Sequence, residues 1–144
     1  MPSSMKQELK IVLDTNVWIS GLIWGGRPAE IIRAAEDNRV SILVSEEIIV
    51  EISRVLNYPR LKDAYQPTGL NREDLIETIF KIGKIIKVTK KLNVVHEHPA
   101  DDKFLECAWA GKANYLVSGD KHVLKIDAYK KTKILRVNDF LRLL

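Results

Sequence analysis

The sequence has little cysteine, few aromatic residues and no long hydrophobic run. Cys107 is the single cysteine among 144 residues, which excludes an intrachain disulfide and a zinc site built from several thiolates. No apolar run approaches the ~18 residues that a membrane-spanning helix needs. Residues 1–10 are polar and do not have the pattern of a signal peptide. We therefore expect a cytoplasmic protein with no membrane contact.

Composition and length indicate one folded domain. Hydrophobic residues make up 46% and charged residues 29% of the chain, which excludes extensive disorder. A length of 144 residues is typical of a single domain. We expect a polar N-terminal extension at residues 1–9 and the domain at residues 10–144.

The formal net charge of +4 hides an uneven distribution of charge. Basic residues concentrate in residues 81–91 and 121–144, so the rest of the chain is acidic. This separation is typical of a protein that binds a polyanion at a site with its own carboxylates. Lysines at such spacing are equally typical of a solvated helix or edge strand.

Short β-branched runs alternate with longer segments of helical periodicity. The runs predict strands at residues 11–13, 42–44, 85–88, 115–117 and 134–137. Helices are expected to begin near Pro28, after Ser45 and after Asn71, and a further helix should contain Phe104 and end at Gly111. Residues 57–69 should form the longest irregular connection. The pattern predicts an α/β fold with a mostly parallel five-stranded sheet covered by helices.

Acidic residues gather at the predicted strand ends. They are Asp14 after the first strand, Glu51 two turns into the helix after the second, Asp101 and Asp102 at the start of the helix before the fourth, and Asp120 after the fourth. Ligand sites in open parallel sheets lie outside the carboxyl ends of the strands. A single Asp at such a place is usually a turn or cap residue, but a set of four or five points to a site.

Clustered carboxylates resist ionising together unless a cation lies among them. A site rich in oxygen ligands suits Mg²⁺ or Mn²⁺. Such an ion can generate hydroxide from water and stabilise charge on a phosphoryl group. Asn16 and Ser118 would add neutral donors, and the basic segments would hold a phosphate backbone.

Three stretches of the chain resemble the motifs of the PIN domain family. They are residues 12–17 (VLDTNV), 101–105 (DDKFL) and 117–120 (VSGD), and the resemblance extends over residues 10–137. It is nearest to the prokaryotic toxins of toxin–antitoxin pairs, the VapC-like ribonucleases. The resemblance implies a Rossmann-like three-layer sandwich and an endoribonuclease that depends on Mg²⁺ or Mn²⁺.

The resemblance also implies residue roles. Asp14, Glu51, Asp101 and Asp120 would be both catalytic and metal-binding, with Asn16, Asp102 and Ser118 in support. Helical phase favours Asp101 over Asp102, because Phe104, Leu105 and Ala108 then fall at i+3, i+4 and i+7. His98 stands where the family often has an Asp, which leaves an outer role for it open.

An RNA substrate, a cognate antitoxin that presents a basic side chain to the carboxylates, and a homodimer are the partners that the resemblance implies. The alternative is a non-catalytic nucleic-acid-binding module with an inactive acidic site, against which the complete acidic set argues. A receiver-like phosphoacceptor is a third hypothesis, but the expected Lys and the paired acids beside the first strand are missing.

Several further residues have two interpretations. Trp24 and Arg27, which flank a Gly pair, and Lys81, Lys84 and Lys87 are candidate nucleic-acid contacts, or else an ordinary loop and a solvated face. The cluster His96-Glu97-His98 and His122 are expected mainly at the surface, although His122 could approach a phosphate. Trp18 and Trp109 should lie in helices at the core or an interface, and Cys107 should be an inert core residue.

Overall fold

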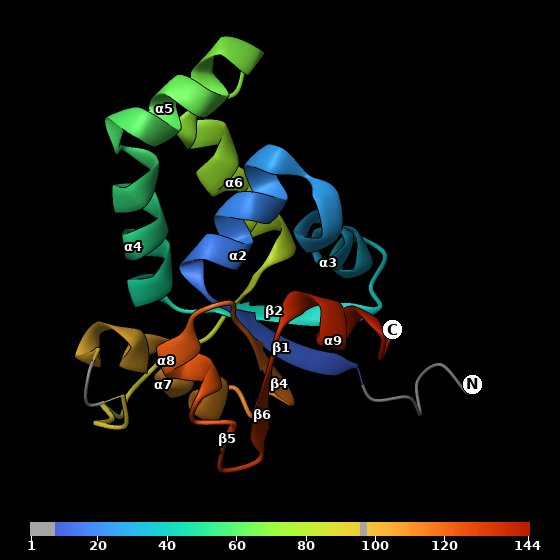
Figure 1. The fold of residues 1–144 in the computed structure, drawn as a ribbon, viewed down its shortest axis with the longest axis vertical. Coiled ribbons are helices and arrows are strands. Elements are labelled where there is room, and N and C mark those ends of the chain that lie inside the picture. Colours follow the sequence, from blue (N-terminus) through green and yellow to red (C-terminus); the bar gives the residue numbers. More distant parts are fainter. Residues whose placement is uncertain (1–7, 96–97) are drawn as a thin grey trace.

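The computed structural model describes residues 8–95 and 98–144 and contains a six-stranded sheet between helical layers (Figure 1). The strands are β1 (Leu9–Leu13), β2 (Val40–Val44), β3 (Lys84–Ile85), β4 (Tyr115–Val117), β5 (Ala128–Tyr129) and β6 (Thr132–Leu135), in the order β3-β2-β1-β4-β6-β5. All neighbouring strands are parallel except the β5–β6 pair. The predicted α/β fold is confirmed. The sequence missed β5 because two residues at a sheet edge leave no periodic pattern.

Helices cover both faces of the sheet. They are α2 (Thr15–Ile19), α3 (Gly26–Glu36), α4 (Glu46–Leu56), α5 (Pro59–Tyr65), α6 (Arg72–Ile82), α7 (Asp102–Ala110), α8 (Lys121–Leu124) and α9 (Val137–Leu141), with a π-helical turn η1 (Ser20–Trp24) and 3₁₀ turns η2 (Gln66–Thr68) and η3 (Pro99–Asp101). Figure 1 shows α2 to α6 on one face and α7 on the other. Across residues 8–95 and 98–144, no helix has the length and apolar character needed to cross a membrane.

Capping residues fix where the helices begin. The Ser45 hydroxyl accepts from the Ile48 N–H (3.3 Å) at the start of α4, and the Asn71 side chain accepts from the Asp74 N–H (2.8 Å) at the start of α6. Gly25 and Gly26 have φ of 75° and 69°, which only glycine adopts readily, and they turn the chain from η1 into α3. These helix starts and the end of α7 at Gly111 confirm the sequence predictions.

The prediction of an irregular connection at residues 57–69 is wrong. Pro59 begins α5, where its fixed φ suits the first helical turn, and η2 follows directly. Leu61 and Tyr65 are the buried anchors of this short helix. The Tyr65 hydroxyl donates to the Leu56 carbonyl (2.6 Å), which ties α5 back onto α4. Two apolar positions in seven residues are too few to show helical periodicity.

The core lies along the central strands. Ile11, Val12 and Leu13 of β1 are completely buried, as the continuous apolar run predicts. The predicted strand at 85–88 is shorter than expected, because β3 lies at the sheet edge and Ile85 remains 50% exposed. Cys107 of α7 is fully buried, and burial raises the pKa of its thiol to about 12, so it is an inert core residue.

Candidate active site

The register of two central strands brings Asp14 and Ser118 together. Leu13 of β1 lies opposite Val117 of β4, so the next residues leave the sheet side by side. The Ser118 hydroxyl donates to Asp14 Oδ2 (2.5 Å) and accepts from the Asp120 N–H (3.0 Å). One buried serine therefore connects the two aspartates at the carboxyl edge of the sheet.

Asp14 is buried at this edge, with 5% of its surface exposed. Its Oδ1 accepts from the Val17 N–H (2.9 Å) and so caps α2. Burial raises the pKa of Asp14, the hydrogen bonds from Ser118 and Val17 act in the opposite direction, and the charge of Asp120 raises it further. The fold thus holds a carboxylate where its ionised form is electrostatically unfavourable.

Asp120 lies at the start of α8 and remains more acidic than usual. Its Oδ1 accepts from the His122 N–H (2.7 Å), and the imidazole Nδ1 of His122 lies 3.2 Å away. Burial acts to raise the pKa of Asp120, but hydrogen bonds from His122 and Val123 outweigh it and lower the pKa. The His122 ring packs against that of His98 with centroids 4.0 Å apart, so both histidines lie beside Asp120. His96 and Glu97 lie outside the described residues.

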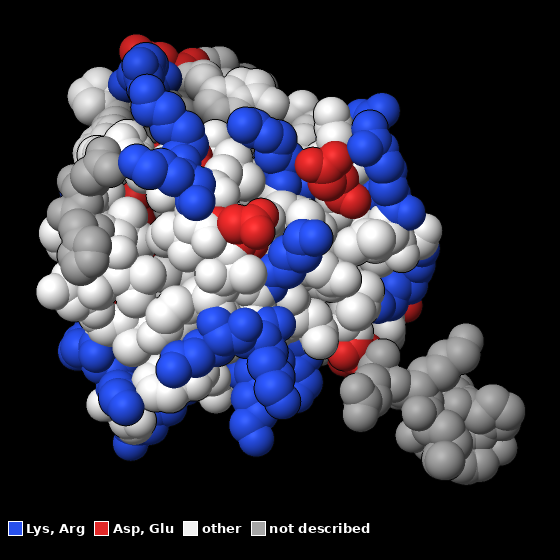
Figure 2. Space-filling view, turned by 60° about the horizontal axis from the view of Figure 1, so that its bottom comes forward, with Lys and Arg blue, Asp and Glu red and all other residues white. Residues whose placement is uncertain are grey.

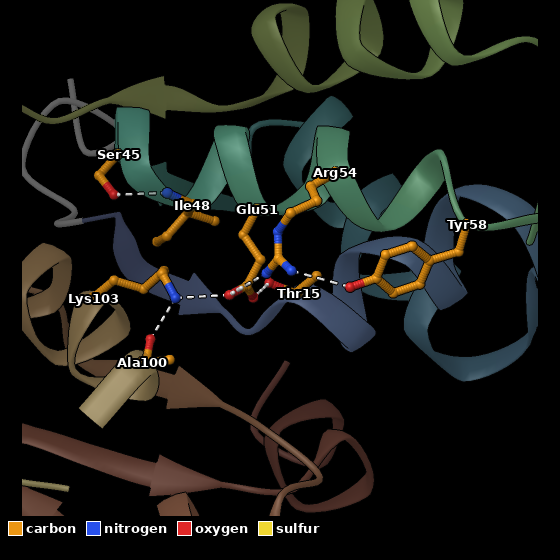
Figure 3. A network of polar contacts seen from close by, with 8 residues as sticks. All are labelled: Thr15, Ser45, Ile48, Glu51, Arg54, Tyr58, Ala100 and Lys103. Atoms are coloured by element: carbon orange, nitrogen blue, oxygen red, sulfur yellow. Dashed lines mark hydrogen bonds and ion pairs between the residues drawn. The ribbon is translucent and has the colours of Figure 1, made fainter. Parts of the chain in front are cut away.

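Glu51 is held by side chains from other elements (Figure 3). Its Oε2 accepts from the Thr15 hydroxyl of α2, and its Oε1 accepts from Lys103 Nζ of α7 at 2.7 Å. Lys103 also donates to the Ala100 carbonyl, and Arg54 Nη2 lies 3.8 Å from Glu51 Oε1. The Lys103 ammonium is a cation built into the acidic cluster.

Asp101 and Asp102 have different surroundings. Burial raises the pKa of Asp101, and the charges of Asp120 and Glu51 add to the rise, so Asp101 lies within electrostatic reach of both acids. Asp102 is 4% exposed, and its Oδ1 accepts from the N–H groups of Val94 (3.1 Å) and Val95 (2.8 Å). Asp101 therefore interacts electrostatically with Asp120 and Glu51, and Asp102 anchors an extended segment.

Three polar residues near the site were not singled out from the sequence. Thr15 and Lys103 lie within two of the quoted motifs, which was the available signal, but their contacts with Glu51 join residues 36 and 52 positions apart. Glu106 is 5% exposed and accepts from the Leu92 N–H (2.9 Å), which holds the same extended segment as Asp102.

The candidate nucleic-acid residues are not gathered at the acidic cluster. Trp24 is 57% exposed and lies ten helical residues, or ~15 Å, along the chain from Asp14. Arg27 follows η1 and is also exposed. Lys81 pairs with Glu77 on α6 (3.4 Å), and Lys84 is exposed on edge strand β3. Lys87 lines a pocket with residues at the start of α4. Asn16 is exposed on α2, next to Asp14.

The donor set fits a hard divalent cation in its chemistry. It consists of the carboxylates of Asp14, Glu51, Asp101 and Asp120 with the Ser118 hydroxyl, all of them oxygen ligands. Among the described residues, no three Asp, Glu, His or Cys side chains stand close enough to enclose an ion. Burial and neighbouring negative charge raise the pKa values of Asp14 and Asp101, and a bound cation would lower both by stabilising the ionised carboxylates.

The fold and site define an α/β protein with acidic side chains at the carboxyl edge of its sheet. A model of the PIN domain family matches residues 10–122, and the chain therefore belongs to the PIN domain family. Members of this family are generally nucleases and usually use divalent metals.

Two known proteins extend this comparison. An uncharacterized protein of Methanocaldococcus jannaschii, MJ1680, is 30% identical over 141 residues, which cover 96% of this chain and 87% of the relative. The crystal structure of VapBC2 from Rickettsia felis bound to a promoter DNA fragment shares the fold, with a TM-score of 0.59 and 13% identity over 88% of this chain and 97% of that one.

Proposed function

We propose that this protein is a metal-dependent endoribonuclease and the toxin of a toxin–antitoxin pair. The observation that carries the proposal is that Ser118 bridges Asp14 and Asp120, while Asp101 interacts electrostatically with both Asp120 and Glu51. Asp14 follows β1, Glu51 lies on α4, Asp101 precedes α7 and Asp120 follows β4. Membership of the PIN domain family supports hydrolysis of nucleic acids.

Asp14, Glu51, Asp101 and Asp120 would hold Mg²⁺ or Mn²⁺. The ion would supply activation of water and stabilisation of charge on the phosphoryl group.

The chain's own residues position these acids. Ser118 orients both Asp14 and Asp120. Thr15 and Lys103 orient Glu51, and the hydrogen bonds from His122 keep Asp120 ionised. Asn16, exposed beside Asp14, would contact the substrate.

Three partners belong to this proposal. The proposed substrate is RNA, and the proposed compartment is the cytoplasm. The motif resemblance and the fold shared with VapBC2 support an antitoxin that covers the acidic edge with a basic side chain. A homodimer would cover apolar positions such as Val50 and Phe80, which are 60% and 55% exposed.

The test is cleavage of end-labelled single-stranded and structured RNAs with Mg²⁺, Mn²⁺ or EDTA. We expect metal-dependent cutting by the wild type and a loss of about 10³-fold or more in Asp14→Asn. Asp127→Asn is the matched control, because Asp127 is exposed with φ of 67°, a conformation that Asn also adopts.

Full activity in Asp14→Asn would overturn the mechanism. RNA binding without cutting under every metal would favour the non-catalytic nucleic-acid-binding module. The control variant should cut at the wild-type rate, which shows that loss of one carboxylate elsewhere is harmless.

A further inference from the structure

A second pocket lies at the opposite end of β4 from the acidic cluster. It has a volume of about 630 Å³, and its lining includes Trp109, Lys112, Asn114, Lys130 and Lys131. We refer to it as the Trp109 pocket. Asn114 and Ser118 stand four strand residues apart, so the two sites are separated by ~13 Å.

Lysine ammonium groups surround the indole of this pocket. Trp109 is partly exposed near the end of α7. Lys90 Nζ lies 4.6 Å and Lys130 Nζ 5.6 Å from the Trp109 ring centroid. Within the described part of the chain, Lys90, Lys112, Lys130 and Lys131 form no ion pair with a carboxylate, whereas Lys91 and Lys103 do. The pocket therefore keeps its positive charge unneutralised.

Two lysines at the rim of the Trp109 pocket have a backbone conformation that is unusual for a residue other than glycine. Lys112 and Lys130 both have φ of 55°, in the left-handed region that glycine adopts most readily. Lys130 and Lys131 form the two-residue loop between β5 and β6, where hairpins prefer glycine at a position of positive φ. Lys112 and Lys130 therefore stand at two positions where the backbone conformation favours glycine.

We propose that the Trp109 pocket binds single-stranded nucleic acid. An indole face stacks on any unpaired base, and ammonium groups that rest on the ring are free to contact backbone phosphates. The pocket volume is within the range of small-molecule sites, so it can admit a base. Figure 2, which turns the bottom of Figure 1 forward, shows Lys and Arg side chains in clusters on this side of the molecule.

The two sites would act on one strand. The ~13 Å runs along β4, whose Leu116 and Val117 are fully buried, so a nucleic-acid strand held at the Trp109 pocket would reach the acidic edge by a longer path over the surface. The identity of this strand as the RNA that is cut rests on the proposed function, but binding at the pocket does not.

The test is fluorescence anisotropy of labelled ten-nucleotide oligouridine in EDTA, where no cleavage can occur. The first variant is Lys130→Gly/Lys131→Ser, which removes both charges and suits the loop conformation, so its melting temperature should not fall. We expect its Kd to rise about tenfold and the slope of log K against log salt to shrink by about 1.4, the value for two phosphate contacts. Arg60→Ala/Lys62→Ala on distant α5 removes the same charge and should bind as the wild type does.

Stacking is tested separately with Trp109→Leu, checked for folding by circular dichroism. We expect a loss of about tenfold in affinity, and quenching of tryptophan fluorescence on binding that this variant lacks. Oligodeoxyuridine shows whether RNA is preferred to DNA. An RNA duplex should bind more weakly, because its bases are already stacked.

The outcomes separate the two proposals. Wild-type affinity in the loop variant, equal loss in the α5 control, or equal binding of the duplex would overturn the Trp109 pocket as a single-strand site. A protein that binds through the pocket but never cuts RNA would refute the nuclease and retain the pocket.

Discussion

The two ends of β4 carry opposite charge, and they differ in whether the charged groups are buried or exposed. At the carboxyl end, Asp14 is buried and fixed by hydrogen bonds from Ser118 and Val17. At the amino end, Lys112 and Lys130 form no ion pair with any carboxylate of residues 8–95 and 98–144, and both have φ of 55°. Asp14 is thus held by nearby donors, as a charged group removed from water requires, whereas Lys112 and Lys130 remain exposed to water.

The strand between them acts as a rigid spacer. Leu116 and Val117 are fully buried, so the separation of the two ends is set by the core.

The largest effect is expected at the third acidic residue. Asp101→Asn should lower RNA cleavage by about 10³-fold with little change in stability, because the charges of Asp120 and Glu51 act on Asp101. Asp102→Ala should instead destabilise the fold by ~1–3 kcal/mol, because the N–H groups of Val94 and Val95 lose their acceptor. Cleavage assays and urea unfolding measure the two effects. A reversal of this pattern would assign Asp102 to the site.

The next effect concerns Lys103, whose ammonium group lies beside Glu51. Lys103→Met removes the ammonium beside Glu51 and should raise the affinity for Mn²⁺ about tenfold, since a like charge near the ion is lost. Electron paramagnetic resonance of free Mn²⁺ measures the affinity without any activity assay. Lys81→Met on α6 is the control. A lower affinity would show that the orientation Lys103 gives Glu51 matters more for the ion than the repulsion by its charge.

A smaller effect is expected on stability. The pKa of Asp14 is raised in the folded state, so its ionisation weakens folding as pH rises from the unfolded pKa through the folded pKa, and the penalty is complete at neutral pH. In EDTA, Asp14→Asn should therefore be more stable than the wild type at pH 7, on the order of 1 kcal/mol. The difference should disappear below the pKa of unfolded Asp. Thermal unfolding across this range measures it, and a less stable variant at pH 7 contradicts the assigned burial cost.

The smallest effect is expected on the basic segment that the sequence singles out. Lys81→Ala/Lys84→Ala should change the affinity for single-stranded RNA by about twofold or less, because Lys81 already pairs with Glu77. Anisotropy at low salt measures it beside the Trp109 pocket variants. A tenfold loss would move the main strand contact to α6 and β3.

The sequence predicts what local pattern determines. The β-branched runs give the strands, and the positions of Asp14 and Asp120 follow from the strand ends. The phase of α7 favours Asp101 as the third acid, and this choice stays a prediction, although the charges of Asp120 and Glu51 do act on Asp101. The contact of Lys103 with Glu51 and the meeting of Lys90 with Trp109 depend on how distant elements pack, so no local pattern encodes them. The short helix α5 was missed because it has only two buried anchors.

The buried thiol has a practical consequence for labelling. Cys107 is fully buried, and its pKa of about 12 leaves almost no thiolate at neutral pH. A maleimide dye would therefore attach to one introduced surface cysteine without removal of the native one. A dye at position 62 on α5 would report the approach of labelled RNA by energy transfer, with the chain's own chemistry left unchanged.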